Sequence, residues 1–508
     1  MTRRPRATLV APAGVVLLAA MSLPVGAQES PVDTLALRAH TYFLAHETLQ
    51  GRGTGTRGAD VAAAYLASQC RRLGLEPVGP DYFQPVPLER ARVLETTRLT
   101  LARAGRERTY TYPVDFVPNI GSKRTLVDFE GPAVYVGDLD ELAPGALDAL
   151  PLEGAVAVTL GVPDPGAAAG LADRAVAGLI HLVGDERALE AYHRSRGVYR
   201  LYHRDSTVPS SFFPPLPSVL AGPAIADGLL AGTPLLAGRD MAPHPLPVRV
   251  RVALGLAPEP IEAANVVCLL RGAAPGAADR AITLTAHHDH LGIGVPDERG
   301  DSVYNGFSDN AAGVGMVLAA AAALQRDRPR PAHSVLLLFF TGEEAGLLGS
   351  DYYVTRPLWP LYQVRAVINL DAGAPPAPPV TWRLAGVDSS GLGATALAIA
   401  AARGWTATTS PPRPNSDYFP FIREGVPAVF IIPGAGPYEG LTADSSDALR
   451  RRWDRYHEPD DEWAEDFPFG GLRRYAEFAL SLVRAIDSSG TDYRASLTGT
   501  RSDPGGSK

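Results

Sequence analysis

The pattern of hydrophobic and polar positions changes twice along the chain. In residues 31–88 the apolar positions recur at helical spacing, which predicts helices that end near Gly74. In residues 128–257 short apolar runs are separated by proline and glycine clusters, which is typical of a small β-rich domain. In residues 262–486 apolar runs alternate with helical patterns, and this alternation predicts an α/β domain.

Both ends of the chain depart from this pattern. Residues 1–27 combine three arginines, an apolar stretch and a small-residue end, which is typical of a signal peptide cleaved after Ala27. Pro12 and Pro24 interrupt the stretch, which is shorter than the ~20 residues of a membrane span. We therefore expect an exported protein, periplasmic or secreted, without stable membrane insertion after cleavage. The expected layout continues with the first part of the main domain (28–127), a β-rich insert (128–257), the rest of the main domain (258–487) and a disordered polar tail (488–508).

The composition excludes several classes of function. The chain has 508 residues, 46% of them hydrophobic, as in an ordinary globular protein of about three folding units. Its net charge is -8 and no basic run stands out, so we expect no nucleic-acid partner. The two cysteines, Cys70 and Cys268, are too few for a cysteine-rich zinc site. Both lie in apolar patterns, and we interpret them as buried small groups that are not bridged, although export permits a disulfide.

One glycine-rich segment invites a nucleotide-binding interpretation. Residues 53–58, Gly-Thr-Gly-Thr-Arg-Gly, match the dinucleotide fingerprint. That fingerprint needs a preceding strand within a βαβ unit, whereas here a helical pattern precedes it. We therefore interpret the segment as a turn. The chain also has no His-Glu-x-x-His helix, Gly-x-Ser-x-Gly elbow or Walker A loop.

Three apolar runs in the α/β region each end in residues that can bind metals. The polar segments that follow these runs are 287–290 (His-His-Asp-His), 341–344 (Thr-Gly-Glu-Glu) and Asp371. The runs are short and rich in β-branched or aromatic residues, which indicates buried parallel strands. Sites in open α/β sheets form at the carboxyl ends of the strands, so we expect these segments to converge.

The acidic residues in these segments favour a metal centre. Unpaired carboxylates cost several kcal/mol each when buried, so a cluster of them needs cations. The three charges of Asp309, Glu344 and Asp371, with one hydroxide, balance two zinc ions. His287 and His457 complete a set of nitrogen and oxygen ligands that suits zinc.

Taken in order, these motifs resemble the M28 family of co-catalytic zinc aminopeptidases. The resemblance includes the segments 51–55, 286–290, 300–306, 308–310, 343–344, 369–371, 415–418 and 456–457. It implies the zinc-peptidase fold, an α/β fold with a central, mostly parallel mixed sheet flanked by helices. It also implies that the middle segment is a protease-associated (PA) domain inserted in the chain. Residue 288 and residues 372–379 depart from the family pattern, which affects the expected substrate pocket but not the metal ligands.

The resemblance also implies a role for each matching residue. Two Zn²⁺ per chain would be bridged by Asp309, with His287 and Asp371 completing one site and Glu344 and His457 the other. The implied catalytic residues are Glu343 as general base, Asp289 as the carboxylate that fixes the tautomer of His287, and Tyr456 as a donor to the developing oxyanion. We interpret four further groups as structural: His288 and His290, His333 at the surface, and Asp417 as a hydrogen-bonding residue near the pocket.

These roles predict an exported dizinc metallopeptidase that removes amino-terminal residues from peptides with a free amino terminus. Three alternatives stay open: a carboxypeptidase, a glutaminyl-cyclase-like relative with one zinc ion, and an inactive binding protein. A carboxypeptidase needs cations for the substrate carboxylate. Arg299 and Arg423 are basic residues close to the motifs in sequence, and neither is adjacent to an expected ligand.

Overall fold

The computed structural model describes residues 30–119, 126–163, 165–184, 187, 189, 199–212, 216–231 and 241–494. The described residues from Val32 onward belong to one compact unit. The expected signal peptide, residues 1–27, lies outside the described residues.

The larger of the two main sheets is mixed, with parallel strands at its centre. Its four central strands run in the order β20, β17, β13, β16, and each is parallel to its neighbour. Toward the edges the pairing turns antiparallel, at β18 on one side and β12 on the other. The fold class expected from the sequence, an α/β fold with a mixed sheet, is confirmed. In sheet order the described strands are β19 (Thr406–Ser410), β18 (Thr381–Ala385), β20 (Ala428–Pro433), β17 (Val364–Asn369), β13 (Ala281–His287), β16 (Ser334–Phe340), β12 (Leu256–Leu270), β2 (Phe83–Val93) and β9 (Tyr199–His203), with β1 (Glu76–Pro77) paired to β12.

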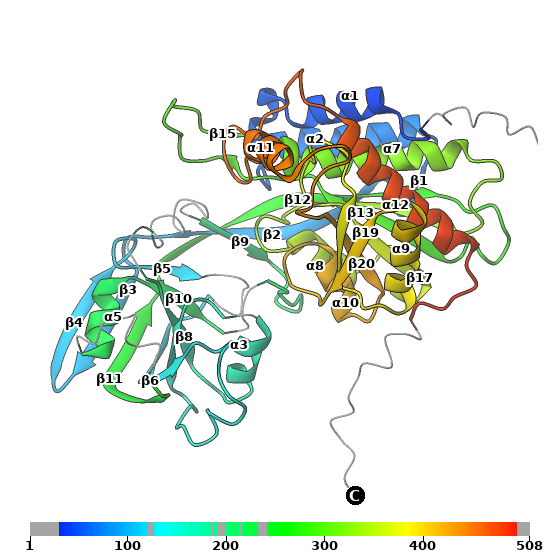
Figure 1. Cartoon of the computed structure of the whole chain (residues 1–508). Helices are drawn as coiled ribbons and strands as arrows, with labels where there is room; N and C mark the ends of the chain where they lie inside the picture. Colours follow the sequence, from blue (N-terminus) through cyan, green and yellow to red (C-terminus); the bar gives the residue numbers. More distant parts are fainter. Residues whose placement is uncertain are drawn as a thin grey trace, which may run out of the picture. The chain divides into compact units, whose positions relative to one another are not determined.

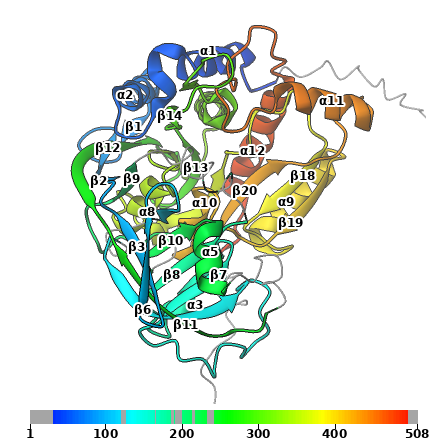
Figure 2. The same ribbon diagram turned by 90° about the vertical axis from the view of Figure 1, so that its left-hand side faces the viewer.

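Helices cover both faces of this sheet (Figures 1 and 2). Along β12, Val266, Cys268 and Leu270 belong to the hydrophobic core on one face, while Val267 and Leu269 belong to the core on the other. Burial on both faces explains why the strands are continuous apolar runs in the sequence. The first core also contains α1 (Thr34–Leu44), α2 (Arg57–Arg72), α7 (Ala312–Arg326), α9 (Gly391–Ala402) and α12 (Gly470–Ser488), and the second contains α8 (Leu348–Thr355) and α10 (Tyr418–Arg423).

One helical stretch of the described chain, Phe307–Arg326, is long and apolar enough to cross a membrane. It comprises η3 (Phe307–Ala311) and α7, and 89% of its most apolar window is buried inside the protein. Its composition therefore matches that of a helix in the core of the larger domain.

A second sheet has its own hydrophobic core. Its order is β4-β3-β11-β6-β7-β8-β10-β5, with β6, β7, β8 and β10 parallel. The sheet takes three strands from before residue 128, where the insert was expected to begin, because β3 pairs with β11 and buries Leu99 and Leu101. In contrast β9, inside the expected insert, joins the larger sheet. The described elements are β3 (Arg98–Arg103), β4 (Arg106–Thr111), β5 (Phe116–Asn119), β6 (Phe129–Gly137), β7 (Val156–Leu160), β8 (Gly178–Leu182), β10 (Ser218–Ala221), β11 (His244–Ala253), α3 (Pro165–Ala172) and α5 (Pro223–Leu230).

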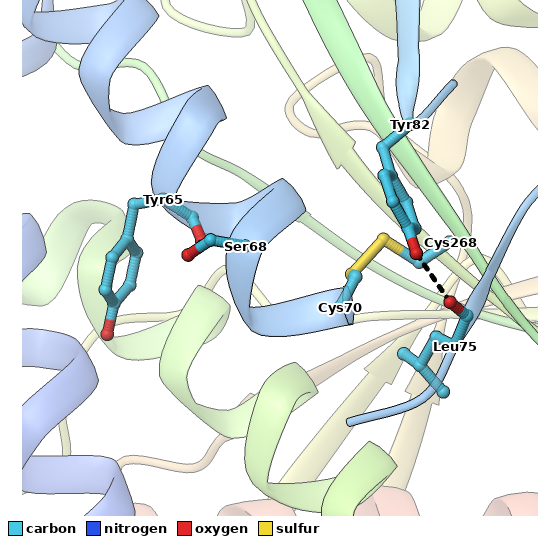
Figure 3. The surroundings of a disulfide bond; sticks show 6 residues. All are labelled: Tyr65, Ser68, Cys70, Leu75, Tyr82 and Cys268. Atoms are coloured by element: carbon cyan, nitrogen blue, oxygen red, sulfur yellow. Dashed lines mark hydrogen bonds between the residues drawn. A yellow bond between two sulfur atoms is a disulfide. The ribbon is translucent and has the colours of Figure 1, made fainter. Parts of the chain in front are cut away.

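A disulfide joins Cys70 on α2 to Cys268 on β12 (Figure 3). The prediction of two unbridged cysteines is therefore wrong. Both side chains are fully buried, as expected, but α2 packs on β12 and brings the two Cα atoms to 6.2 Å. Beside the bond, the Tyr82 hydroxyl donates a hydrogen bond to the Leu75 carbonyl at 2.7 Å.

The chain after α12 is ordered further than the sequence indicates. Tyr493 is buried, and Arg365 donates hydrogen bonds to the carbonyls of Ser489 and Thr491. Arg494 donates to the Gly425 carbonyl at 2.9 Å. The expectation of a disordered tail from residue 488 is thus wrong for residues 489–494, because backbone contacts that leave no apolar pattern hold them. Residues 495–508 lie outside the described residues.

Candidate metal centre

The three polar segments predicted to converge do meet at one edge of the larger sheet. β13 ends at His287 and lies parallel to both β16 and β17, so the carboxyl ends of the three strands are neighbours. Glu343 and Glu344 follow β16, and Asp371 follows β17. Two segments distant in the chain add Asp309, from η3, and His457.

Asp309 stands at the centre of the cluster and directs its two carboxylate oxygens to two different groups. Its Oδ1 lies 3.0 Å from Nε2 of His287, which is itself 2.8 Å from Oδ1 of Asp371. Its Oδ2 lies 3.1 Å from Nε2 of His457, which is also 3.1 Å from Oε2 of Glu344. The expected five ligands are therefore arranged as two sets that share one carboxylate.

The donor atoms of this cluster fit divalent cations. Nε2 of His457 is buried and makes no hydrogen bond of acceptable geometry, although two carboxylate oxygens lie 3.1 Å away. A polar atom in that position is satisfied by a cation that it shares with the carboxylates. The ligand atoms of His287, Asp309 and Asp371 all lie within 4.8 Å of one another, as a single ion requires. The mixture of imidazole nitrogen and carboxylate oxygen suits zinc.

The pKa shifts in the cluster indicate that its carboxylates favour positive charge beside them. Burial lowers the pKa of His457, but Asp309 and Glu344 outweigh burial and raise this pKa to about 10. Burial raises the pKa of Glu344, yet contacts with His290 and His457 lower it to about 2. The pKa values of Asp309 and Glu344 are thus lowered, while those of the neighbouring His287 and His457 are raised. Metal cations supply the same positive charge without protons.

Glu343 differs in pKa from Asp309 and Glu344. Its Oε2 lies 4.0 Å from Nε2 of His287. Burial raises its pKa well above the usual range, and the nearby acids Asp371 and Glu344 add to the shift. A carboxyl group with a raised pKa is suited to accept and return a proton. Ligand atoms of Glu343, His287 and Glu344 also lie within 4.8 Å of one another.

The Asp289 carboxylate does not make the hydrogen bond to His287 that is expected from the sequence. Nδ1 of His287 lies 3.2 Å from the backbone carbonyl of Asp289 and 3.7 Å from its carboxylate, so the hydrogen bond is with the carbonyl. The carboxylate instead accepts hydrogen bonds from the Glu343 backbone N–H at 3.2 Å and from the Thr54 hydroxyl at 2.8 Å. Asp289 therefore positions the Glu343 turn as well as His287. The histidine tautomer is fixed by the backbone, because the turn after β13 brings this carbonyl back to the ring.

A buried hydrogen-bond chain orients Asp371. Thr285 donates to Asn369 at 2.6 Å, Asn369 donates to Ser416 at 2.7 Å, and Ser416 donates to Oδ2 of Asp371. Because Oδ2 is held by Ser416, Oδ1 faces His287. Ser416 belongs to a segment that shares the family resemblance, but its hydroxyl gave no signal of this role.

The turn that carries Asp309 is held by Asp461. Its carboxylate accepts hydrogen bonds from the backbone N–H groups of Ser308 and Asp309, at 2.9 and 3.1 Å. The next peptide bond, between Asp309 and Asn310, is cis, and Asn310 donates to the Leu370 carbonyl at 3.0 Å. Sequence reasoning missed Asp461, which lies four residues after His457 and is indistinguishable by pattern from its exposed acidic neighbours.

The four groups interpreted as structural have different outcomes. His290 belongs to the cluster, since its Nδ1 lies 2.7 Å from Oε1 of Glu344. His288 is buried outside it, where burial lowers its pKa to about 4, and lines a pocket of about 370 Å³ with α2, β2 and β12. His333 is buried between Asp487 and Arg365, so its expected surface position is wrong. Asp417 accepts a hydrogen bond from Ser350 at 2.5 Å, consistent with the expected structural role.

Tyr456 lies at the solvent-facing side of the cluster. Its ring stacks on the His457 ring with centroids 3.8 Å apart, and the residue is 67% exposed. The backbone of His457 has a positive φ of 58°, which turns the imidazole inward while the preceding side chain faces solvent. An exposed phenol beside the cluster is accessible to a substrate.

Comparison with known proteins identifies the domain that contains the cluster. Residues 265–483 match peptidase family M28, so this part of the chain is an M28 peptidase domain. A probable zinc metalloprotease of Leptosphaeria maculans is 33% identical over 114 residues, which is 22% of this chain and 25% of that protein. The chain thus aligns with only a quarter of the length of this curated relative.

Two solved aminopeptidase structures are similar to this chain. An aminopeptidase from Aneurinibacillus sp. strain AM-1 has a TM-score of 0.53 at 17% identity, covering 90% of this chain and 94% of the other. The zinc aminopeptidase BSAP from Bacillus subtilis has a TM-score of 0.46 at 18% identity, covering 90% and 95%. The first similarity supports the same fold over most of the chain.

Proposed function

We propose that this chain is an exported metallo-aminopeptidase that binds two zinc ions and hydrolyses the amino-terminal peptide bond of peptide substrates. The observation that carries the proposal is the position of Asp309. Its two oxygens face two separate sets of ligand-type side chains, each with one histidine and one further carboxylate. One shared carboxylate between two such sets is the arrangement that a pair of metal ions requires.

The M28 domain supports zinc as the metal: His287 and Asp371 would hold one ion, Glu344 and His457 would hold the other, and Asp309 would contribute to both. Zinc, when bound, polarises a carbonyl oxygen and lowers the pKa of water. Glu343 is then the group that accepts the proton from the attacking water and returns it to the leaving amine. Its raised pKa favours that exchange.

Other residues of the chain orient this chemistry. The Tyr456 hydroxyl donates a hydrogen bond to the carbonyl oxygen as negative charge develops there, and its exposed ring can meet a bound peptide. Asp289 accepts a hydrogen bond from the backbone N–H of Glu343 and so holds the base in place. Ser416 keeps one oxygen of Asp371 turned toward the cluster.

The charges around the site favour a substrate with a free amino terminus. A carboxypeptidase needs an available cation for the substrate carboxylate. Three arginines near the motifs in sequence are already paired: Arg299 with Asp297 at 2.8 Å, Arg423 with Asp351 at 2.9 Å, and Arg455 with Asp460 at 2.9 Å. The cluster itself is rich in carboxylates, which attract a substrate ammonium group.

Export is proposed from two observations. Residues 1–27 have the pattern of a signal peptide. The disulfide between Cys70 and Cys268 forms and persists in an oxidising compartment such as the periplasm or the extracellular space. For the second sheet, we propose the role of a PA-like insert that controls access of substrates, since the proposed catalytic residues all belong to the larger domain.

The function is tested with the purified mature protein and a panel of aminoacyl chromogenic amides. We expect hydrolysis that is lost on dialysis against a chelator and restored by zinc. The matched control is the same panel with acetylated amino groups, which the proposed site does not accept. Absence of hydrolysis by zinc-loaded protein, or activity that survives removal of metal, contradicts the proposal.

A further inference from the structure

The segment 51–54, which overlaps the glycine-rich turn at 53–58, packs directly against the candidate metal centre. Gly51 has a positive φ of 68°, and a Cβ there would lie 2.4 Å from the Gly292 carbonyl oxygen. Gly53 forms a bridge with His290, whose backbone N–H donates to the Arg52 carbonyl at 3.2 Å. Small residues at 51 and 53 thus allow the segment to lie against the turn that follows β13.

Arg52 is a buried cation that binds backbone carbonyls. The residue is 1% exposed, and its guanidinium donates hydrogen bonds to four carbonyl oxygens. Nε donates to His288 at 3.0 Å, and Nη2 donates to Gly306 at 3.0 Å. Nη1 donates to Asn305 at 2.6 Å and to Leu44. Among the described ion pairs, no carboxylate lies within 4.0 Å of this guanidinium.

Three of the four carbonyls, those of His288, Asn305 and Gly306, belong to segments that carry the metal-type residues. His288 lies between His287 and Asp289, and Gly306 immediately precedes η3, which contains Asp309. One planar guanidinium therefore fixes the distance between the two turns that supply these acids and this histidine. A lysine at this position could not donate in four directions from one plane.

The charge of Arg52 also faces the cluster. Burial lowers its pKa to about 10, and the carboxylates of Asp289 and Asp309 oppose that shift most strongly. The guanidinium attracts these carboxylates through the intervening backbone, while its hydrogen bonds go to carbonyl oxygens. A fixed positive charge in this place reduces the repulsion among carboxylates that must assemble before metal arrives.

Thr54 extends the same contact. Its hydroxyl donates to Oδ2 of Asp289 at 2.8 Å, while Oδ1 of that carboxylate accepts the N–H of Glu343. Both residues are buried, so the hydroxyl is the side-chain donor that satisfies this oxygen in the described structure. The segment is therefore linked to the turn that carries Glu343 as well as to the turns that carry His287 and Asp309.

We propose that Arg52 and Thr54 are positioning residues of the zinc centre, which preorganise the His287–Asp289 and Asp309 turns for metal binding without touching metal or substrate. This inference rests on the proposed function. Side chains that orient ligands from behind typically change metal affinity by about 10- to 100-fold when removed. Removing the guanidinium of Arg52 or the hydroxyl of Thr54 should therefore weaken zinc binding.

The test uses Arg52→Lys and the nearly isosteric Thr54→Val in the full-length mature protein. Zinc affinity is measured by competition with a chromogenic chelator, and melting temperature is measured with and without zinc. We expect each variant to bind zinc at least about tenfold more weakly, and to show a smaller rise in melting temperature on zinc addition than the wild type. If Arg52→Lys does not fold, Thr54→Val carries the test.

Arg365→Lys is the matched control. Arg365 is also buried and donates to two backbone carbonyls, but at the opposite end of β17 from Asp371. Its replacement should lower the melting temperature equally with and without zinc and leave zinc affinity unchanged. Unchanged zinc affinity in both Arg52→Lys and Thr54→Val, with a melting temperature lowered equally with and without zinc, would overturn the inference. A wild-type protein that binds no zinc would instead overturn the proposed function.

Discussion

Oδ2 of Asp309 lies 3.1 Å from Nε2 of His457, although more than a hundred residues separate them in the chain. The larger sheet brings the β13 and β17 ends to the same place, and the turns after α11 (Ala443–Trp453) return His457 to it. The contact completes a second set of ligands next to that of His287. The role of every other residue at the site depends on this pairing of two sets around one carboxylate.

Glu343 and Glu344 are adjacent acids with different proposed roles, and they provide a matched pair of variants. Glu343→Gln should retain both zinc ions and lose at least about a hundredfold in kcat, because the loss of a general base typically costs that much. Glu344→Gln should lose one zinc ion, since this side chain faces His457 and His290. Metal analysis with steady-state kinetics distinguishes them. Loss of metal in Glu343→Gln with retention in Glu344→Gln would show that the roles are reversed.

The direction of cleavage follows from the charges near the site. Peptides with a free amino terminus should be cut from that end, because the carboxylate cluster attracts the ammonium group. Acetylation of the amino terminus should abolish cleavage, and amidation of the carboxyl terminus should change it little. Mass spectrometry of timed digests measures both effects. Cleavage of acetylated peptides, with amidated ones spared, would favour the carboxypeptidase alternative.

The disulfide between Cys70 and Cys268 should stabilise the larger domain without affecting the metal centre. Removing a bond that closes so long a loop typically costs about 2–5 kcal/mol of unfolding free energy. The double variant Cys70→Ala/Cys268→Ala should therefore unfold at a lower denaturant concentration, with unchanged zinc content. Alkylation of the unfolded, unreduced wild type should label no thiol. Two labelled thiols would contradict the bond.

His181 predicts part of the pH dependence of stability. It is fully buried in the second sheet, where burial lowers its pKa from 6.5 to about 4, and its Nδ1 lies 2.8 Å from the Thr159 hydroxyl. Because the unfolded chain binds the proton more readily, the stabilisation is present above pH 6.5 and is lost as pH falls toward 4. The shift corresponds to about 3 kcal/mol.

His181→Gln should therefore show a shallower loss of unfolding free energy between pH 6.5 and 4 than the wild type. Urea unfolding at a series of pH values measures the slope. Thr159→Val is the companion variant, because it keeps the histidine and removes only its hydrogen-bond partner. An identical pH slope in wild type and His181→Gln would contradict the prediction.

The sequence was sufficient to predict the centre of the larger domain. The runs before His287, Glu343 and Asp371 are buried on both faces, so they lack alternation and are recognisable as central parallel strands. Residues at their carboxyl ends must then converge. Site residues at the ends of these central strands can therefore be predicted from the hydrophobic pattern alone.

Contacts between distant segments could not be predicted in the same way. The bond from Ser416 to Asp371, the support of Asp309 by Asp461 and the disulfide all join surfaces whose packing leaves no periodic signal. The early start of the second sheet has a similar cause. No strand is predicted at residues 98–103 from the sequence, and only the pairing of β3 with β11 places that strand in the second sheet.

The most direct test is the zinc content of extensively dialysed wild-type protein, measured by inductively coupled plasma mass spectrometry against protein concentration from amino-acid analysis. The arrangement of two ligand sets around Asp309 predicts two equivalents of zinc per chain. Asp309→Asn, measured in parallel, should fall below two, because it removes the bridging charge. One equivalent or none in the wild type would contradict the dinuclear centre.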